Sequence, residues 1–192
     1  MISFYIPTFR VKAAAVFITV AVFFMCCYSW AGSFQGRIVK VSDGDTVWVK
    51  AGNSGRKIKI RVLGIDTPEK FRSKKLTHQA IICSVSEKRI VYLGKLASKH
   101  AKEILDHLPV RIETFGHGRY GRVLGFIFVG KENFSYRMVE DGYACVYRTK
   151  YGKSRELPYL DWIKLLSLER KARQERRGLW SIDYELMNCL CR

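Results

Sequence analysis

Residues 57–69 of the chain read Lys-Ile-Lys-Ile-Arg-Val-Leu-Gly-Ile-Asp-Thr-Pro-Glu. The first six residues alternate between basic and apolar side chains, which is the period of a β-strand with one buried face. Pro68 has no N–H to donate to a strand ladder, so the strand ends before it. The segment therefore predicts a strand over residues 57–65, followed by a turn that carries two carboxylates.

Further strands and helices are predicted on either side of this segment. The expected strands are 36–41, 46–50, 110–115, 123–129 and 143–147, and the expected helices are 93–108, 135–141 and 158–177. Tight turns are expected at Asp43-Gly44-Asp45 and at residues 53–55, and a glycine-rich turn at residues 116–121. Residues 71–91 are basic and weakly periodic, and we expect a loop or mixed segment there.

This order of elements predicts an α+β fold, namely a five-stranded OB-type β-barrel with about three helices. The absence of an internal repeat in the sequence indicates one domain, over residues 35–181, followed by a cysteine-containing tail over residues 182–192. A barrel of this kind presents a concave face suited to single-stranded nucleic acid.

The charge of the chain is strongly positive. It has 34 Lys and Arg against 17 Asp and Glu, a net charge of +17, while 48% hydrophobic residues exclude a disordered polymer. Such an excess attracts polyanions, and nucleic acid is the first candidate because each neutralised phosphate releases counterions. A merely solubilising surface and adhesion to anionic lipid are the alternatives.

Residues 1–31 have the organisation of a secretory signal peptide. Arg10 and Lys12 precede an apolar run over residues 13–28, and Ser29-Trp30-Ala31 supplies a cleavage site. The run is shorter than the ~20 residues of a typical membrane-spanning helix, and an uncleaved N-terminal anchor is the alternative. Cleavage leaves 32 basic against 17 acidic side chains, a net charge of +15. We therefore expect an exported protein, periplasmic or secreted, with membrane contact only through an uncleaved N-terminal segment.

Four cysteines follow the signal segment: Cys83, Cys145, Cys189 and Cys191. An even number in an oxidising compartment predicts disulfides. Cys189 and Cys191 are too close to pair with each other, so each is expected to pair with Cys83 or Cys145, in either of two connectivities. Free thiols are the alternative, and a zinc site is disfavoured because no CxxC motif or histidine pair accompanies the cysteines.

The acidic residues that carry the candidate chemistry lie at strand ends and in the turns beside them. They are Asp43, Asp45, Asp66 and Glu69. Hard oxygen ligands of this kind suit Ca²⁺, which takes six to eight of them, whereas Mg²⁺ demands stricter octahedral geometry. Taken alone, Asp43-Gly44-Asp45 is more simply a hairpin turn.

Two arginines complete the candidate site. Arg61 lies on the polar face of its strand, and Arg122 begins the strand after the glycine-rich turn. A guanidinium binds two phosphate oxygens and stays charged at physiological pH. Two of them beside a divalent cation would neutralise a five-coordinate phosphorus transition state, with Glu69 as a general base for the attacking water.

Four motifs in this order resemble the staphylococcal nuclease (thermonuclease) family. They are Val41-Ser-Asp-Gly-Asp-Thr46, Arg61-Val-Leu-Gly-Ile-Asp-Thr-Pro-Glu69, Arg119-Tyr-Gly-Arg122 and Gly178-Leu-Trp-Ser181. The resemblance covers residues 35–181. It implies a calcium-dependent nuclease that hydrolyses DNA and RNA phosphodiester bonds and leaves 3′-phosphate ends, with no obligate protein partner, and we expect a monomer.

The resemblance also implies a role for each matching residue. Asp45 and Asp66 match calcium-binding carboxylates and Thr67 a backbone carbonyl ligand, so the Thr67 side chain is expected to matter least. Asp43 matches an acid that acts on the metal through water. Arg61, Glu69 and Arg122 match the catalytic residues; Arg119, Tyr120 and Tyr147 match substrate contacts. The spacing differs near Tyr147, for which a core tyrosine of the last strand is the alternative.

The basic insertion 70–92 departs from the family pattern. It carries Lys70, Arg72, Lys74 and Lys75, and we expect it to lie beside the active site and to widen substrate contact or cover the groove. A nucleic-acid-binding module without activity is one competing hypothesis, which the complete catalytic set disfavours. A lipid-binding role for the basic helix 164–177 is another, which its apolar stripe disfavours.

Overall fold

The computed structural model describes residues 32–52, 54–118 and 121–192. Residues 31–192 form one compact unit. The predicted signal peptide and two predicted substrate contacts, Arg119 and Tyr120, lie outside the described residues. Within the described ranges, no helix is long and apolar enough to cross a membrane.

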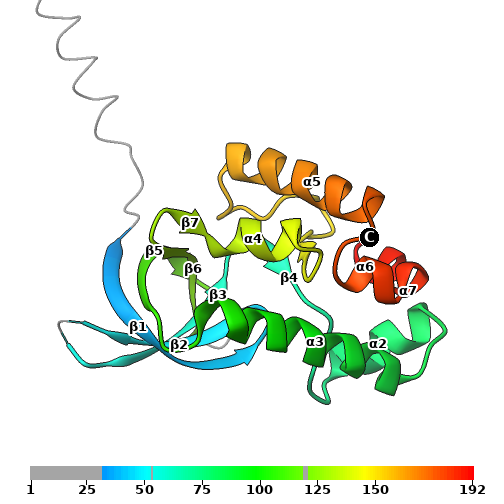
Figure 1. The fold of residues 1–192 in the computed structure, drawn as a ribbon, viewed down its shortest axis with the longest axis horizontal. Helices are drawn as coiled ribbons and strands as arrows, with labels where there is room; N and C mark the ends of the chain where they lie inside the picture. Colours follow the sequence, from blue (N-terminus) through cyan, green and yellow to red (C-terminus); the bar gives the residue numbers. More distant parts are fainter. Residues whose placement is uncertain (1–31, 53, 119–120) are drawn as a thin grey trace, which may run out of the picture. The chain divides into compact units, whose positions relative to one another are not determined.

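A closed five-stranded barrel forms the centre of the fold (Figure 1). Its strands are β1 (Ser33–Asp43), β2 (Thr46–Ala51), β3 (Lys57–Val62), β5 (Pro109–His117) and β6 (Val123–Val129). The antiparallel order is β3-β2-β1-β5-β6, and a parallel pairing of β3 with β6 closes the barrel. β7 (Glu132–Asn133) extends the β6 edge, and β4 (Ile65–Asp66) pairs separately with β8 (Cys145–Val146).

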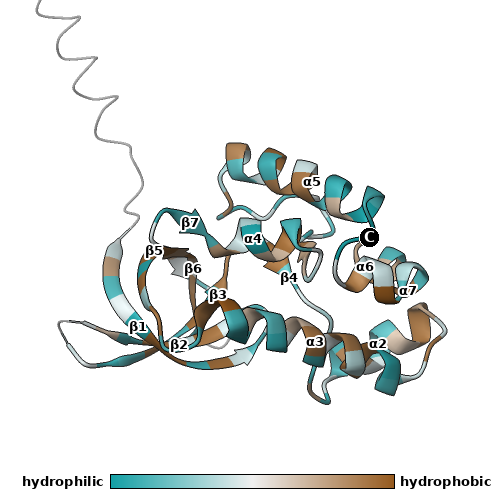
Figure 2. Ribbon diagram, in the orientation of Figure 1, coloured by the Kyte–Doolittle hydropathy of each residue, from teal (hydrophilic) through white to brown (hydrophobic). Residues whose placement is uncertain are grey.

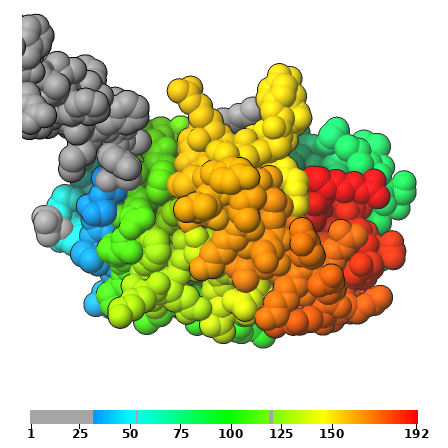
Figure 3. Space-filling model, turned by 90° about the horizontal axis from the view of Figure 1, so that it is seen from above, coloured from blue at the N-terminus to red at the C-terminus, as the bar shows by residue number. Residues whose placement is uncertain are grey.

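Six helices surround the barrel in the described part of the chain. They are α2 (Lys74–Ile82), α3 (Glu87–Leu105), α4 (Phe134–Glu140), α5 (Tyr159–Gln174), α6 (Leu179–Ile182) and α7 (Tyr184–Leu190). α3 has apolar residues at helical spacing, and Ile90, Leu93, Ala97, Ala101 and Leu105 are all buried. In Figure 3 the segment between β8 and α5 projects from the surface beside α5.

Two hydrophobic clusters stabilise these elements. The larger one fills the barrel with alternate residues of its strands, including Ile38, Val47, Val49, Ile60 and Ile112, which have no exposed surface. The second joins α2, α3, α6 and α7 around the buried Trp180. Figure 2 shows the hydrophobic residues of α3 along the face that meets these clusters.

Two disulfides attach the C-terminal tail to the domain. Cys83, at the end of α2, pairs with Cys189, and Cys145 of β8 pairs with Cys191. This is one of the two connectivities that the sequence left open. α7 lies in the tail, where Leu186 and Met187 are buried in the second hydrophobic cluster.

The predicted α+β fold with an OB-type barrel is confirmed. The three predicted helices correspond to α3, α4 and α5. The prediction of a loop or mixed segment over residues 71–91 was wrong where α2 lies and where α3 begins, at Glu87. Ser73 caps α2, since its hydroxyl accepts a hydrogen bond from the Leu76 N–H at 3.1 Å.

Candidate active site

Asp45, Arg61, Asp66 and Thr67 come together at one end of the barrel. Asp45 lies in the turn between β1 and β2, Asp66 is the last residue of β4, and Thr67 follows it. Arg61 is in β3, directly across from Thr46 of β2. Because β3 lies beside β2 and runs on into β4, residues about 20 positions apart in the sequence share one small volume.

Asp45 is buried, at 4% exposure, and every oxygen of its carboxylate has a partner. Oδ1 accepts a hydrogen bond from the Thr46 hydroxyl at 3.0 Å and forms an ion pair with Arg61. Oδ2 accepts from the Thr67 N–H at 3.0 Å and from the Thr67 hydroxyl at 3.1 Å. These contacts fix the carboxylate in position and keep a charged group in a buried place.

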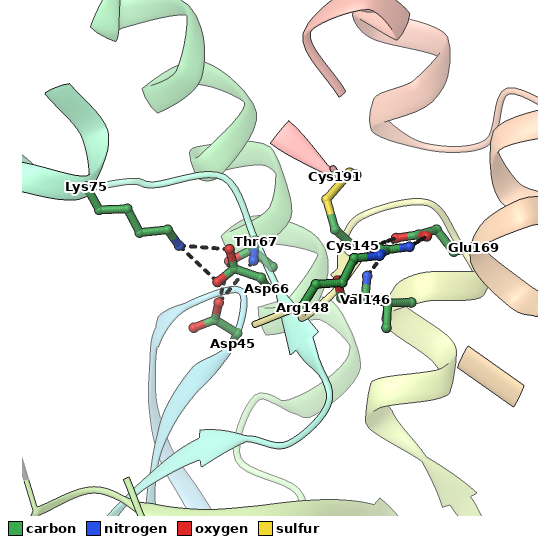
Figure 4. Close-up of a disulfide and its surroundings, with 9 residues drawn as sticks. All are labelled: Asp45, Asp66, Thr67, Lys75, Cys145, Val146, Arg148, Glu169 and Cys191. Carbon is green, nitrogen blue, oxygen red and sulfur yellow. Dashed lines mark hydrogen bonds and ion pairs between the residues drawn. A yellow bond between two sulfur atoms is a disulfide. The ribbon is translucent and has the colours of Figure 1, made fainter. Parts of the chain in front are cut away.

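Asp66 lies between two cations, Arg61 and Lys75. The Arg61 Nη2 atom is 2.7 Å from Asp66 Oδ1. The Lys75 ammonium is 2.9 and 2.8 Å from the two carboxylate oxygens of Asp66 (Figure 4). Burial alone would raise the pKa of Asp66, but the charges of Arg61 and Lys75 hold that pKa below its ordinary value. Asp66 therefore stays ionised in the folded protein.

Lys75 also binds Glu69, whose Oε1 atom is 2.9 Å from the ammonium group. Burial alone would lower the pKa of Lys75, but Asp66 and Glu69 raise it above its ordinary value. Ser73, the cap of α2, donates a long hydrogen bond of 3.5 Å to Glu69 Oε2. α2 therefore positions two side chains against the carboxylates of the site.

The loop that carries Glu69 lies directly on α3, because residue 94 of that helix is glycine. A Cβ atom at Gly94 would lie 2.6 Å from the Pro68 carbonyl oxygen and 2.7 Å from the carbonyl carbon and oxygen of Glu69. No real side chain fits at such distances. Because Gly94 has no side chain, the loop that carries Glu69 can pack directly against the backbone of α3.

Asp43 lies in the same turn as Asp45. Its Oδ1 atom accepts a hydrogen bond from the Asp45 N–H at 3.2 Å. Burial raises the pKa of Asp43 above its ordinary value, although Arg61, Thr46 and Lys70 act in the opposite direction. The main contact of this acid is with the backbone of the turn, which is consistent with a supporting place beside the site.

Arg122 and Tyr147 come from elements beside the strands that carry the other site residues. Arg122 precedes Val123, which pairs with Ile60 of β3, so the arginine enters β6 beside the strand that carries Arg61. Tyr147 follows β8, donates its N–H to the Gly64 carbonyl at 2.9 Å and is 40% exposed. The alternative of a core tyrosine is wrong, because this side chain is on the surface.

The donor set fits a hard divalent cation. Asp45 and Asp66 are held against the same guanidinium, one carboxylate on each terminal nitrogen, so their oxygens already surround a positive charge. With the carbonyl of Thr67 they make an all-oxygen set of the kind Ca²⁺ prefers. In the described residues, Cys145, Glu169 and Cys191 form the one group of three that meets the geometry for a metal, and its cysteines are bonded to each other.

β4 pairs with β8, and β8 is in turn bound to the tail and to α5. Asp66 is the cross-strand partner of Cys145, whose sulfur is bonded to Cys191. The neighbouring Val146 donates its N–H at 2.7 Å to Glu169 of α5, which is 8% exposed and forms an ion pair with Arg148 (Figure 4). A disulfide and a buried carboxylate therefore support the strand that presents Asp66.

Gly94 and Glu169 were not among the residues predicted for the site, and Lys75 was expected only as part of the basic insertion beside it, without a role of its own. A signal for Lys75 was present, because Ser73 is a good N-cap residue and would have placed Lys75 in the first turn of a helix beside Glu69. Gly94 interrupts a strongly helical sequence, which often has a packing reason. Nothing in the local sequence indicates the contact of Glu169 with Val146, since the two lie 23 residues apart.

Comparison with known proteins agrees with the family resemblance of the sequence motifs. A family model for staphylococcal nuclease homologues matches residues 59–182. A protein of Escherichia coli described as an uncharacterized endonuclease is 30% identical over 158 residues, which are 80% of this chain and 84% of that one.

Two further relatives carry nuclease names. A micrococcal nuclease of Shigella flexneri is 28% identical over 181 residues, covering 90% of this chain and 84% of its own length. A thermonuclease of Staphylococcus hyicus is 28% identical over 149 residues, covering 76% and 75%. The region matched by the family model includes Arg61, Asp66, Glu69 and Arg122.

Proposed function

We propose that this chain, which belongs to the family of staphylococcal nuclease homologues, is an exported, calcium-dependent nuclease that hydrolyses DNA and RNA. The observation that carries the proposal is the contact of Arg61 with both Asp45 and Asp66. It joins two candidate metal ligands to a candidate phosphate-binding group at the mouth of a barrel suited to nucleic acid. The nuclease names of relatives similar over most of the chain support the same reaction class.

The proposed calcium ion would be held by Asp45, Asp66 and the carbonyl of Thr67. When bound, it would polarise a phosphate oxygen and stabilise the negative charge that develops on phosphorus. Arg61 and Arg122 bind the non-bridging oxygens of the same phosphate, because their guanidinium groups form two parallel hydrogen bonds. Arg119, Tyr120 and Tyr147 contact the neighbouring nucleotide.

Glu69 acts as the general base that takes a proton from the attacking water. Its ion pair with Lys75 and the seating of its loop on Gly94 hold the carboxylate near the other acids. In-line attack opposite the 5′ oxygen breaks the P–O5′ bond and leaves a 3′-phosphate and a 5′-hydroxyl, as in the family that the motifs resemble. Action as a monomer is part of this proposal.

Export is supported by the signal-like residues 1–31 and by the two disulfides, because disulfides persist in oxidising compartments.

The test is a cleavage assay on single-stranded DNA and RNA with Ca²⁺, with Mg²⁺ and with EGTA. We expect cleavage with Ca²⁺ and none with EGTA. Arg61→Ala should lower kcat by about 100- to 1,000-fold, because one charged group that stabilises the transition state is lost. Glu69→Gln should lower it similarly. Labelling of the product ends before and after phosphatase treatment determines where the phosphate remains.

Arg170→Ala is the matched control, since Arg170 is exposed on α5 and makes none of the contacts described above for the site. It should leave cleavage unchanged. Undiminished cleavage in EGTA would reject the calcium mechanism. Salt-dependent binding of DNA without turnover under any metal would instead support a binding module.

A further inference from the structure

The outward face of β1, β2 and β3 carries an aromatic residue between two lysines. Lys40 of β1 lies directly opposite Trp48 of β2, and Trp48 lies directly opposite Lys59 of β3. Side chains of directly opposed residues point to the same face of a sheet. The Lys59 ammonium lies 5.7 Å from the centre of the Trp48 ring. These three residues therefore form one row across the sheet.

Two further rows lie on the same face, because every second residue of β2 and β3 returns to it. In β1 the matching residues are three apart, since an irregularity in the pairing between each of them adds one residue. On one side of Trp48, Arg37, Lys50 and Lys57 are cross-strand partners and form a wholly basic row. On the other side the row is Asp43, Thr46 and Arg61, which belongs to the candidate active site. Successive rows are about 7 Å apart. The basic rows thus lead directly away from Arg61.

We call the six residues of the wholly basic row and of the Trp48 row the basic strip: Arg37, Lys40, Trp48, Lys50, Lys57 and Lys59. Its five cations are exposed, Trp48 is half-buried, and the alternate residues beneath them fill the barrel core. Arg37 also donates a hydrogen bond of 2.8 Å to the His107 carbonyl, which leaves the lysines as the more adaptable cations.

The acidic and basic residues of this segment are separated along the strands. Between residues 33 and 62 the carboxylates are Asp43 and Asp45, and both lie at the active-site end of the strands. The other charged residues of this segment are all basic. The β2–β3 hairpin, which carries several of them, projects from the barrel (Figure 1). A polyanion bound there would have its end at the acids and Arg61, where a metal and a phosphate could meet.

We propose that the basic strip binds the part of a single-stranded nucleic acid that extends beyond the phosphodiester being cleaved. The proposal rests on the nuclease function proposed above. Lysines contact the phosphates, and Trp48 offers an aromatic face on which a base stacks. Stacking requires an unpaired base, so the strip favours single strands over duplexes. The strip would make affinity depend on substrate length without taking part in the chemistry.

The test is binding of fluorescently labelled DNA to the disulfide-bonded protein in EDTA, where no cleavage competes. Affinity is measured for single strands of 3 and 12 nucleotides and for a 12-base-pair duplex, over a range of salt concentrations. The variants are Trp48→Ala, Trp48→Phe and the double change Lys40→Ala with Lys59→Ala. The control is Lys88→Ala with Lys95→Ala, two exposed lysines of α3.

We expect Trp48→Ala to weaken binding of the 12-nucleotide strand about tenfold, and Trp48→Phe to restore most of the loss, because phenylalanine still stacks. The lysine double change should lower the slope of log K against log salt by about 0.7 for each phosphate that the protein no longer neutralises. The affinity gained between 3 and 12 nucleotides should shrink in these variants and persist in the α3 control.

Equal loss of duplex and single-strand binding in Trp48→Ala would overturn the stacking role. Unchanged single-strand binding in both sets of strip variants would overturn the strip as a whole. If the variants lose binding to phosphatidylserine vesicles and keep binding to DNA, the face is a membrane surface instead. Failure of cleavage with Ca²⁺ is measured separately and would reject the nuclease function without affecting this result.

Discussion

Arg61 and Lys75 are the two cations that neutralise Asp66, and each has a second carboxylate partner. Arg61 also contacts Asp45, and Lys75 also contacts Glu69. Four charged side chains besides Asp66 itself are therefore linked through that one residue. A change at any of them alters the charge balance of the others, so substitutions here are not expected to be additive.

The link between Lys75 and Asp66 predicts a pH-dependent effect on stability. The pKa of Asp66 is lower in the folded protein than its ordinary value of 3.8, so its ionised form stabilises the fold above that pH. This contribution is lost as the pH falls through the folded pKa. In EDTA, Lys75→Ala should reduce the free energy of unfolding at pH 7 by at most about 1 kcal/mol, because Lys75 is exposed to screening water.

Urea unfolding at pH 7, 5, 4 and 3 measures this effect, and the difference between Lys75→Ala and the parent protein should shrink below pH 4. Lys74→Ala is the matched control, since Lys74 is the exposed neighbour in the same helix. A difference of constant size at all four pH values would contradict the assigned contact with Asp66.

Thr67 contributes more than the carbonyl that the sequence assigned to it. Its hydroxyl donates to the buried Asp45 at 3.1 Å, so the expectation that its side chain matters least needs revision. Thr67→Val keeps the volume and removes the donor. We expect a loss of about 1 kcal/mol in unfolding free energy and weaker Ca²⁺ binding by calorimetry. Thr67→Ser should retain both, and equal behaviour of the two variants would exclude a role for the hydroxyl.

Among the elements, α3 helps to position the site although it supplies none of the proposed catalytic residues. Its buried face contacts the barrel and the second hydrophobic cluster, and its Gly94 receives the Glu69 loop. α2 then closes over that loop from the other side with Ser73 and Lys75. The position of Glu69 is thus determined by two helices, one beneath it and one beside it.

Gly94→Ala separates helix stability from loop position. Alanine in place of a helical glycine normally stabilises a protein by up to about 1 kcal/mol. Here the new methyl group would lie 2.6 Å from the Pro68 carbonyl, so we expect no gain in stability and a fall in kcat of tenfold or more. Lys95→Ala, at the next, exposed position of α3, controls for changes in the helix itself. Full activity with increased stability would show that the loop adapts freely.

The barrel could be predicted from sequence and α2 could not, for a physical reason. In β2 and β3 the apolar residues alternate cleanly because one face is buried in the barrel. In α2 only Leu76 and Ala80 are buried, while Ile81 and Ile82 are 71% and 59% exposed, so the pattern has no apolar stripe. The site motifs could be read because they are local, whereas Lys75 depends on a contact that α2 creates.

For the molecule as a whole, the tail connects the parts of the site that the barrel alone does not hold. Through Cys189 it reaches α2, which carries Lys75, and through Cys191 it reaches β8, the partner of the strand that carries Asp66. The two cross-links close loops of 106 and 46 residues. Taken singly, loops of this length predict about 4 to 5 kcal/mol of stabilisation each, mainly through the unfolded state.

Reduction of the protein should therefore lower its stability strongly. We expect a lower denaturant midpoint with dithiothreitol than without it. In the double variant Cys83→Ser with Cys189→Ser, this difference in midpoint should be smaller than in the parent protein. The variant Cys145→Ser with Cys191→Ser should also show a smaller difference in midpoint between the two conditions. Its activity should be lower as well, because Asp66 is paired with residue 145. Equal midpoints under reducing and oxidising conditions would mean that the tail adds nothing.

The position of these cysteines in the chain also determines the order in which the protein matures. Cys189 and Cys191 are synthesised after every strand of the barrel and after all the proposed catalytic residues. Neither disulfide can form until the segment that contains α7 has emerged from the ribosome. A chain truncated anywhere between Gly178 and Cys189 would contain every proposed catalytic residue and lack both disulfides.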